Sequence, residues 1–266
     1  MSGRLADKVA VIVGGGQTPG QTIGNGRATA MLFAREGARV VVVDRDRDRA
    51  DDTCRAIAEE GGVARAVAAD ATVEADCQRL VADVVATEGR LDILHNNVGI
   101  GGRDSTPSRI DPDAWDEVMG VNLKSVVLPC KAALPVMRRQ GGGSIVNVSS
   151  IAAVCATPLI AYKTSKAGIN AYTQSLAVGN ARYMIRANVI MPGLMDTPMA
   201  IEFISEARGM DRDDLRAERN AQVPLGGQMG TAWDVAHAAL YLASDEARFV
   251  TGVVLPVDGG QSARIG

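Results

Sequence analysis

Short apolar runs alternate with longer amphipathic segments along the whole chain. Seven runs rich in Val, Ile and Ala have the length of strands that are buried on both faces of a sheet. They occupy residues 9–13, 40–43, 63–68, 91–94, 144–148, 186–190 and 253–257. Apolar residues recur at helical spacing in the intervals 27–36, 47–60, 73–88, 122–139, 160–180 and 232–243. Asp111-Pro112 and Thr231 are typical helix starts.

A strand followed each time by a helix predicts the α/β class. The expected architecture is one doubly wound, Rossmann-like domain over residues 1–266, with a seven-stranded parallel sheet and helices on both faces. The insertion at residues 195–229 interrupts the alternation between the sixth and seventh strands. Because ligands bind at the carboxyl ends of parallel strands, this insertion is expected to form a substrate lid.

Composition narrows the classes of function. Hydrophobic residues make up 47% of the 266 residues, the net charge is −3, and no basic stripe is present, so nucleic acid is not expected as a partner. No signal peptide and no apolar stretch of membrane-spanning length is visible, which predicts a cytoplasmic protein without a membrane partner. The four cysteines are widely spaced and no metal site is expected; of the two histidines, His95 is expected to be packed and hydrogen-bonded.

A glycine-rich turn follows the first predicted strand. It begins at Gly14 and ends with Gly24, Asn25 and Gly26, where a helix opens. Glycines permit close approach of the backbone to a pyrophosphate, and the N–H groups at the helix start can bind the anion. The same composition also occurs in flexible surface loops, but its place between a strand and a helix favours a dinucleotide site.

Asp44 ends the second predicted strand. A carboxylate at this place can accept hydrogen bonds from both ribose hydroxyls of adenosine and repels a 2′-phosphate, which favours NAD over NADP. Asp44 could instead cap the following helix, and the neighbouring Arg45 could tolerate a phosphate.

Tyr162 and Lys166 lie four residues apart in a predicted helix and therefore share one face. A phenol titrates near ~10, so a nearby ammonium is expected to stabilise the phenolate and make Tyr162 a usable base. A Tyr and a Lys at this spacing also occur by chance on exposed helices. The surrounding motifs must therefore decide whether the pair is catalytic.

That context resembles the classical short-chain dehydrogenase/reductase family, and the resemblance covers essentially the whole chain. The matching motifs follow the order found in the family. They are the turn ending in Gly24-Asn25-Gly26, Asp70-Ala71, Asn96-Asn97-Val98-Gly99, Asn122, Asn147-Val148-Ser149-Ser150, Tyr162 with Lys166, Pro192-Gly193 with Thr197, and Val257-Asp258-Gly259-Gly260.

The resemblance implies a role for each matching residue. Tyr162 would be the acid/base, Ser150 would hydrogen-bond the substrate oxygen, Lys166 would hold the nicotinamide ribose, and Asn122 would support a proton path. Asp70 and Ala71 would flank adenine, and Asn97 would contact a ribose. Pro192, Gly193 and Thr197 would lie at the carboxamide.

Two features depart from the family pattern. The glycine turn is six residues longer than usual, which resembles enoyl-thioester reductases and leaves the contacts of residues 17–22 open. Eleven residues separate Ser150 from Tyr162, one fewer than the common spacing, so counting back from Tyr162 would select Ser149. Ser150 is preferred, because a loop absorbs a deletion more readily than a strand end changes the face of its side chain.

The sequence therefore predicts an NAD-dependent oxidoreductase that interconverts a small, apolar or cyclic secondary alcohol and its ketone. The alternatives are a ketoacyl or enoyl thioester reductase using NADP, and a catalytically silent nucleotide-binding protein. The family resemblance further implies a homotetramer, packed through the helices at residues 122–139 and 160–180.

Overall fold

Seven parallel strands form the central sheet of the computed structural model, which describes residues 3–264. In spatial order they are β3 (Val63–Ala68), β2 (Arg39–Asp44), β1 (Val9–Val13), β4 (Ile93–Asn96), β5 (Gly143–Val148), β6 (Ile185–Pro192) and β9 (Val254–Val257). The chain moves outward from β1 to β3 and then returns to add β4 on the other side of β1. At this reversal the connections on the two sides diverge, which is where open α/β sheets bind their ligands.

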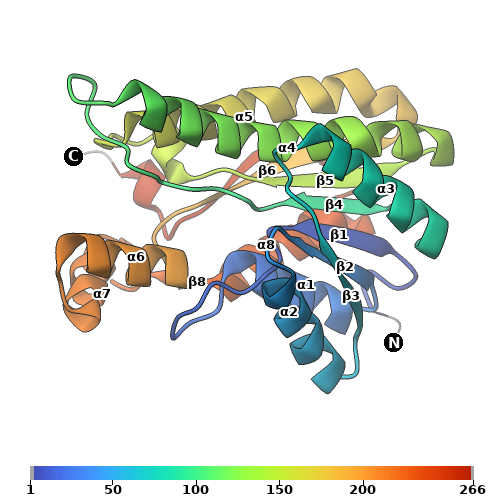
Figure 1. Ribbon diagram of the computed structural model, residues 1–266, viewed down its shortest axis with the longest axis horizontal. Coiled ribbons are helices and arrows are strands. Elements are labelled where there is room, and N and C mark those ends of the chain that lie inside the picture. The colour runs from blue at the N-terminus through green and yellow to red at the C-terminus, as the bar shows by residue number, and fades with distance from the viewer. Residues whose placement is uncertain (1–2, 265–266) are drawn as a thin grey trace.

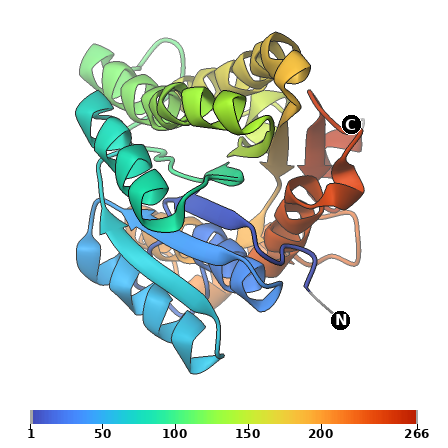
Figure 2. The same ribbon diagram turned by 90° about the vertical axis from the view of Figure 1, so that its right-hand side faces the viewer.

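Helices cover both faces of the sheet (Figures 1 and 2). One layer holds α1 (Asn25–Arg35), α2 (Arg47–Glu59) and α8 (Ala232–Ala243), and the other holds α3 (Glu74–Glu88), α4 (Pro112–Gln140) and α5 (Ile160–Asn180). The predicted doubly wound α/β architecture is confirmed.

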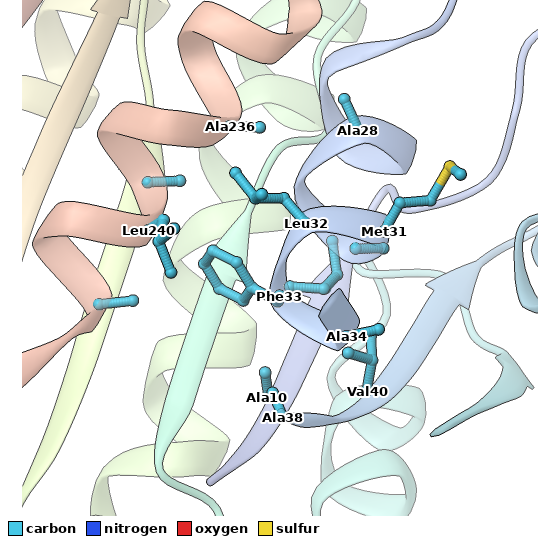
Figure 3. Packing of buried hydrophobic residues seen from close by; sticks show 14 of the residues in the cluster. Ala10, Ala28, Met31, Leu32, Phe33, Ala34, Ala38, Val40, Ala236 and Leu240 are labelled. Carbon is cyan, nitrogen blue, oxygen red and sulfur yellow. The ribbon is translucent and has the colours of Figure 1, made fainter. Parts of the chain in front are cut away.

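Alternate residues of each strand contribute to two separate cores, since successive side chains point to opposite faces of a sheet. Ala10 and Ile12 of β1 join the core beneath α1 and α8, while Val11 and Val13 join the core beneath α3, α4 and α5. Figure 3 shows the first core, in which the buried ring of Phe33 points from α1 toward Leu240 of α8.

The predicted boundaries differ from the structure most at α4. This helix begins at Pro112, where the start signal lies and where the Asp111 carboxylate accepts a hydrogen bond from the Asp113 N–H at 3.0 Å, rather than at Asn122. Asn122 therefore lies in the third turn of the helix and not near its start. The fourth strand begins at Ile93 rather than at residue 91, and the Asp92 carboxylate just before it accepts the N–H of Val9 at 2.9 Å.

The insertion after β6 forms its own small unit. It contains α6 (Pro198–Arg208) and α7 (Arg212–Asn220), and the two-residue strands β7 (Met195–Asp196) and β8 (Gly230–Thr231) pair in parallel at its base. Figure 1 shows this unit projecting beside the carboxyl edge of the sheet. Within residues 3–264 no helix has the length and apolar character needed to cross a membrane.

Candidate active site

The glycine turn after β1 makes a backbone contact that leaves no room for side chains. A Cβ on Gly26 would lie 1.9 Å from the carbonyl oxygen of Gly14, and Gly14 itself has φ +76°. The same carbonyl accepts a hydrogen bond from Asn97 Nδ2 at 3.1 Å, which ties the end of β4 to the turn. The predicted residues Gly14, Gly26 and Asn97 therefore lie together at the point of strand reversal.

The start of α1 is suited to an anion. Its N-cap residue, Gly24, has no side chain that could cap the helix, and the first turn carries no acidic residue. Asn25 Oδ1 is buried without a hydrogen-bond partner within the described part of the chain and, as an acceptor, suits a donor group of a ligand rather than the anion itself. A helix start with unpaired N–H groups and a glycine-lined approach fits the pyrophosphate of a dinucleotide.

The extended part of the turn is ordered by Gln17. Its side-chain amide donates to the carbonyls of Thr18 and Thr22, and its carbonyl accepts from the N–H of Gly24. Sequence reasoning left these contacts open, and the structure shows that residues 17–24 close on themselves.

The tip of this turn reaches the insertion, as the blue loop beside α6 in Figure 1 shows. The Gln21 N–H donates to Glu202 of α6 at 3.2 Å, and Arg216 of α7 donates to the side chain of Gln21 at 3.2 Å. The turn predicted to hold pyrophosphate and the segment predicted to form a lid are therefore in direct contact.

The end of β2 places a carboxylate beside the turn. Asp44 Oδ2 lies 2.5 Å from the position that a Cβ on Gly16 would take, while Oδ1 accepts the N–H of Asp46 at 3.1 Å. The cap of α2 is Asp46, whose carboxylate accepts the N–H groups of Asp48 and Arg49, so the alternative that Asp44 caps this helix is wrong. Asp44 Oδ2 faces the turn, a position compatible with binding ribose.

Asp70 and Ala71 follow β3. Asp70 Oδ1 accepts hydrogen bonds from the N–H and the hydroxyl of Thr72 at 2.8 and 2.6 Å, and the bonds from Thr72 hold the pKa of Asp70 below its usual value. Ala71 is buried in the core above α3. The hydrogen bonds between Asp70 and Thr72 thus stabilise the conformation of this loop, independently of any contact with a ligand.

Pro192 ends β6, and Gly193 follows under a tight constraint. A Cβ on Gly193 would lie 2.4 Å from Gln261 Oε1, an oxygen that also accepts the N–H of Leu194 at 2.8 Å. Thr197 is buried at the start of α6, where its hydroxyl does not cap the helix. These three residues line the end of β6 opposite the glycine turn.

Ser150 rather than Ser149 faces Tyr162. The Ser150 side chain lies close enough to the Tyr162 phenol to lower its pKa, whereas Ser149 Oγ donates to the backbone carbonyl of Lys166 at 2.8 Å and is buried. The loop after Ser150 is therefore the segment that is one residue shorter than in the common family pattern. This agrees with the expectation that a loop accommodates a deletion more readily than the end of a strand.

Lys166 lies beneath the same phenol. Its Nζ is 5.5 Å from the centroid of the Tyr162 ring and donates to the carbonyl of Val148 at 3.1 Å. The side chain is almost completely buried, and burial lowers the pKa of the ammonium to about 8.

The phenol does not titrate as the sequence suggested. Burial raises the pKa of Tyr162 above its ordinary value, and the hydrogen bond with Ser150, rather than the Lys166 ammonium, opposes the rise. Loss of solvation acts on both groups, so each is driven toward its neutral form.

Asn122 joins three parts of the site. Its amide nitrogen donates to the carbonyl of Ile100 and to Ser165 Oγ at 3.0 and 2.9 Å, and its oxygen accepts the N–H of Ile100 at 2.8 Å. The buried amide thus fixes α4 to α5 and to the loop after β4, and its side chain is occupied by protein partners.

Two further residues hold the site and were missed in the sequence. Lys163 Nζ donates to the carbonyls of Ala152 and Cys155 at 3.2 and 2.6 Å and closes the loop after Ser150. Asp104 accepts the N–H of Tyr162 at 2.7 Å. Neither belongs to a recognisable motif, and both act on backbone groups, which leave no trace in a sequence pattern.

An open cavity of about 440 Å³ lies beside the Ser150 loop. It is lined by Val154, Cys155 and Ala156 of the loop and by Gln261, Ser262 and Arg264 near the carboxyl terminus. Its wall is therefore apolar on one side and polar on the other.

The expectation that His95 is hydrogen-bonded is wrong. Both ring nitrogens are buried without a partner in residues 3–264, and the ring meets Phe33 edge-on at 6.4 Å between centroids. Burial lowers the pKa of His95 to about 3, which keeps it neutral and makes it a packing residue. No group of three or more His, Cys, Asp or Glu in the described chain is arranged to hold a metal ion.

Comparison with known proteins adds independent findings. The family model described as enoyl-(acyl carrier protein) reductase matches residues 21–262. The chain is 39% identical to the 7alpha-hydroxysteroid dehydrogenase of Clostridium sardiniense, over 97% of this chain and 94% of that protein. It is 38% identical to the cis-4-hydroxycyclohexanecarboxylate dehydrogenase of Sinomonas cyclohexanicum, over 99% and 100%.

A solved structure agrees with these relatives. The crystal structure of a putative short-chain dehydrogenase/reductase from Burkholderia xenovorans superposes with a TM-score of 0.90 at 42% identity, covering 99% of this chain and 100% of that one. The shared fold and the identities over nearly full length leave one conclusion: this chain belongs to the short-chain dehydrogenase/reductase family, the NAD(P)-dependent oxidoreductases that act on CH–OH groups.

Proposed function

We propose that the protein is an NAD-dependent dehydrogenase of small, ring-shaped secondary alcohols, which also reduces the matching ketones. The observation that carries the proposal is the placement of the Tyr162 phenol beside the Ser150 side chain and over the buried Lys166 ammonium, next to a glycine turn with an open helix start. A catalytically silent nucleotide-binding protein would have no need for a buried ammonium beneath a phenol.

The proton chemistry follows from these groups. As an alcohol is oxidised, its hydroxyl proton passes to the oxygen of Tyr162; as a ketone is reduced, Tyr162 returns the proton to the new alkoxide oxygen. Ser150 donates a hydrogen bond to the substrate oxygen and stabilises its negative charge. A bound dinucleotide would supply the hydride acceptor or donor through its nicotinamide ring and would be held by Gly14, Gly24, Asn25, Gly26, Asn97, Lys166 and Thr197.

Burial disfavours the phenolate form of Tyr162 that is needed to accept the proton of the alcohol. In the chain alone, burial favours the neutral phenol of Tyr162 and the neutral amine of Lys166. A positive charge arriving with oxidised nicotinamide would favour the phenolate. The base form of Tyr162 is thus best formed when the cofactor is in place.

The preference for NAD rests on Asp44. Its Oδ2 faces the glycine turn, where it would accept ribose hydroxyls and repel a phosphate. Arg45, the residue that could offset this repulsion, is exposed at the start of the following loop.

The substrate class is supported by the relatives and by the insertion. Both relatives named above act, by their names, on hydroxyl groups of ring systems. The exposed Met199 and Phe203 lie four residues apart on α6 and share one face, which suits an apolar ring beneath a lid formed by residues 195–229. Met195 and Ile201 are buried in the fold and serve packing instead.

A thioester reductase using NADP is the second candidate. The name of the matching family model and the extended glycine turn favour it. The four-residue spacing of Tyr162 and Lys166 does not, because enoyl-thioester reductases carry a longer one. Acetoacetyl and crotonyl thioesters, offered with NADPH in place of ketones, would reveal ketoacyl and enoyl reductase activity respectively.

The assembly and location of the protein stay predictions. We infer a homotetramer through α4 and α5; the exposed Val178 on α5 is the kind of apolar residue that such an interface would cover. The cytoplasm is the location proposed from the sequence.

Replacing Tyr162 by Phe tests the proposed function. Removing the hydroxyl removes the proton carrier, so kcat for cyclohexanol and related ring alcohols is expected to fall by about 10²–10⁴-fold. Formation of NADH at 340 nm measures the rate, and quenching of protein fluorescence measures NAD binding, which should persist. Tyr183→Phe is the matched control, and full turnover by Tyr162→Phe would refute the proposal.

The two serines are separated by paired substitutions. Ser150→Ala is expected to lower kcat by about 10²–10³-fold, because a donor to the reacting oxygen is lost. Ser149→Ala is expected to keep turnover close to that of the wild type while lowering the melting temperature, because it loses the bond to the Lys166 carbonyl. The opposite pattern in steady-state assays would assign the role to Ser149.

The cofactor preference depends on one carboxylate. Asp44→Ser is expected to lower kcat/KM for NAD by about tenfold or more, because charge-assisted hydrogen bonds to ribose are lost, and to raise kcat/KM for NADP. Asp48→Ser, at an exposed position on α2, serves as control. A wild-type enzyme that already prefers NADP would contradict the assignment.

Buried Lys166 is expected to lower the stability of the protein at neutral pH. Its pKa is near 10.5 in the unfolded chain and about 8 in the folded one, so the unfolded chain binds more protons between these values. The cost is therefore present below pH 8, amounts to about 3 kcal/mol, and disappears as the pH rises toward 10.5.

Lys166→Met should remove this cost together with one hydrogen bond worth about 1 kcal/mol. We expect the variant to be inactive but more stable at pH 7 by about 2 kcal/mol in urea unfolding, with a smaller difference at pH 9.5. Exposed Lys124→Met should show no such pH dependence. A variant less stable than the wild type at pH 7 would show that the hydrogen bond outweighs the burial.

A further inference from the structure

The helix that carries Tyr162 and Lys166 begins without a cap of its own. Its N-cap residue, Leu159, has no side-chain group that could accept a hydrogen bond. The helix's own bonding begins only with the Lys163 N–H, which donates to the Leu159 carbonyl at 3.0 Å. The three preceding N–H groups therefore require partners from elsewhere.

All three partners come from two adjacent residues far away in the sequence. Asp104 Oδ1 accepts the Ala161 N–H at 3.1 Å and Oδ2 accepts the Tyr162 N–H at 2.7 Å, while the Ser105 carbonyl accepts the Ile160 N–H at 3.3 Å. Oδ1 also accepts the Ser105 N–H at 2.7 Å, which fixes the orientation of the carboxylate. A carboxylate at a helix start is also favoured by the helix dipole.

The segment that supplies this cap is itself held in place. Residues 97–105 leave β4 with Asn97 bonded to the Gly14 carbonyl, and Ile100 exchanges two hydrogen bonds with the buried Asn122. Between them, a Cβ on Gly99 would lie 2.9 Å from Lys166 Nζ. The cap is therefore connected to the dinucleotide turn through a short, bonded stretch of chain.

We propose that Asp104 is a positioning residue for Tyr162, which sets the place of the phenol relative to Ser150 by fixing the first turn of α5. This role rests on the proposed function of Tyr162. Ser150 lies two residues after β5, whereas Tyr162 belongs to the start of α5, so their alignment depends on how the first turn of α5 is held. Asp104 bonds the backbone of Tyr162 itself and does not touch the reacting groups.

Three variants test the proposal with cyclohexanol and a panel of related ring alcohols at saturating NAD. Asp104→Ala removes both bonds, and kcat is expected to fall about 10- to 100-fold, because a small displacement of a reacting group has an effect of this size. The Kd of NAD should stay near the wild-type value. Asp104→Asn keeps one acceptor oxygen for the Tyr162 N–H and should recover much of the loss.

Asp111→Ala is the matched control. Asp111 caps α4 through the Asp113 N–H in the same way, seven residues further along the chain, but that helix start carries no part of the site. Losing a cap there should lower stability by a similar amount and leave kcat unchanged. Assays are run well below the melting temperature of every variant.

Hydrogen exchange of the protein alone supplies a readout that does not require turnover. Asp104→Ala should speed exchange in the peptide that contains Ile160, Ala161 and Tyr162, and Asp111→Ala should not. Two results would overturn the positioning role alone, provided that the wild type is active. One is a kcat of Asp104→Ala no lower than that of Asp111→Ala, and the other is unchanged hydrogen exchange at the start of α5 in Asp104→Ala. A wild type without turnover on the whole panel would overturn the proposed function and this role with it.

Discussion

The pairing of β1 with both β2 and β4 is the constraint on which the site depends. Because the strands are parallel, their carboxyl ends meet at one edge, and because the chain reverses direction around β1, the loops at that edge diverge there. Gly14, Asp44 and Asn97 lie at the carboxyl ends of three neighbouring strands and converge on the turn before α1. The close contact with the Gly14 carbonyl requires glycine at position 26, since a side chain there would push α1 away from the sheet, and the φ of +76° favours glycine at position 14.

The chemistry of the site is built on loss of solvation. Tyr162, Ser150 and Lys166 lie together in a space where neither charged form is favoured in the chain alone. Stability alone would favour apolar residues at position 166, and the chain retains an ammonium instead. Such a residue is understandable where function, rather than folding, determines which side chain is kept.

The sequence predicted the sheet well because each strand is a local apolar run, and the order of motifs placed most site residues on the correct loops. The start signal of α4, Asp111-Pro112, was recognised in the sequence, but the length of the helix was underestimated. The first turns of α4 bury only Ala114 and Val118, so the apolar pattern there is weak. The bonds made by Asp104 and Lys163 could not be predicted, since their partners are backbone groups, in the case of Asp104 57 and 58 residues away. The prediction for His95 was wrong because an imidazole is usually hydrogen-bonded, whereas the core around His95 offers no partner in the described part of the chain.

The strand order has a further consequence for the nascent polypeptide on the ribosome. β1, β2 and β3 with their helices emerge first and pair in sequence, but the other edge of β1 remains unpaired until β4 is synthesised some eighty residues later. An exposed apolar strand edge invites aggregation, so this interval is when a chaperone would be of most use. The half of the protein that carries the glycine turn can thus take shape during translation, whereas Ser150, Tyr162 and Lys166 join it only after the chain has passed its midpoint.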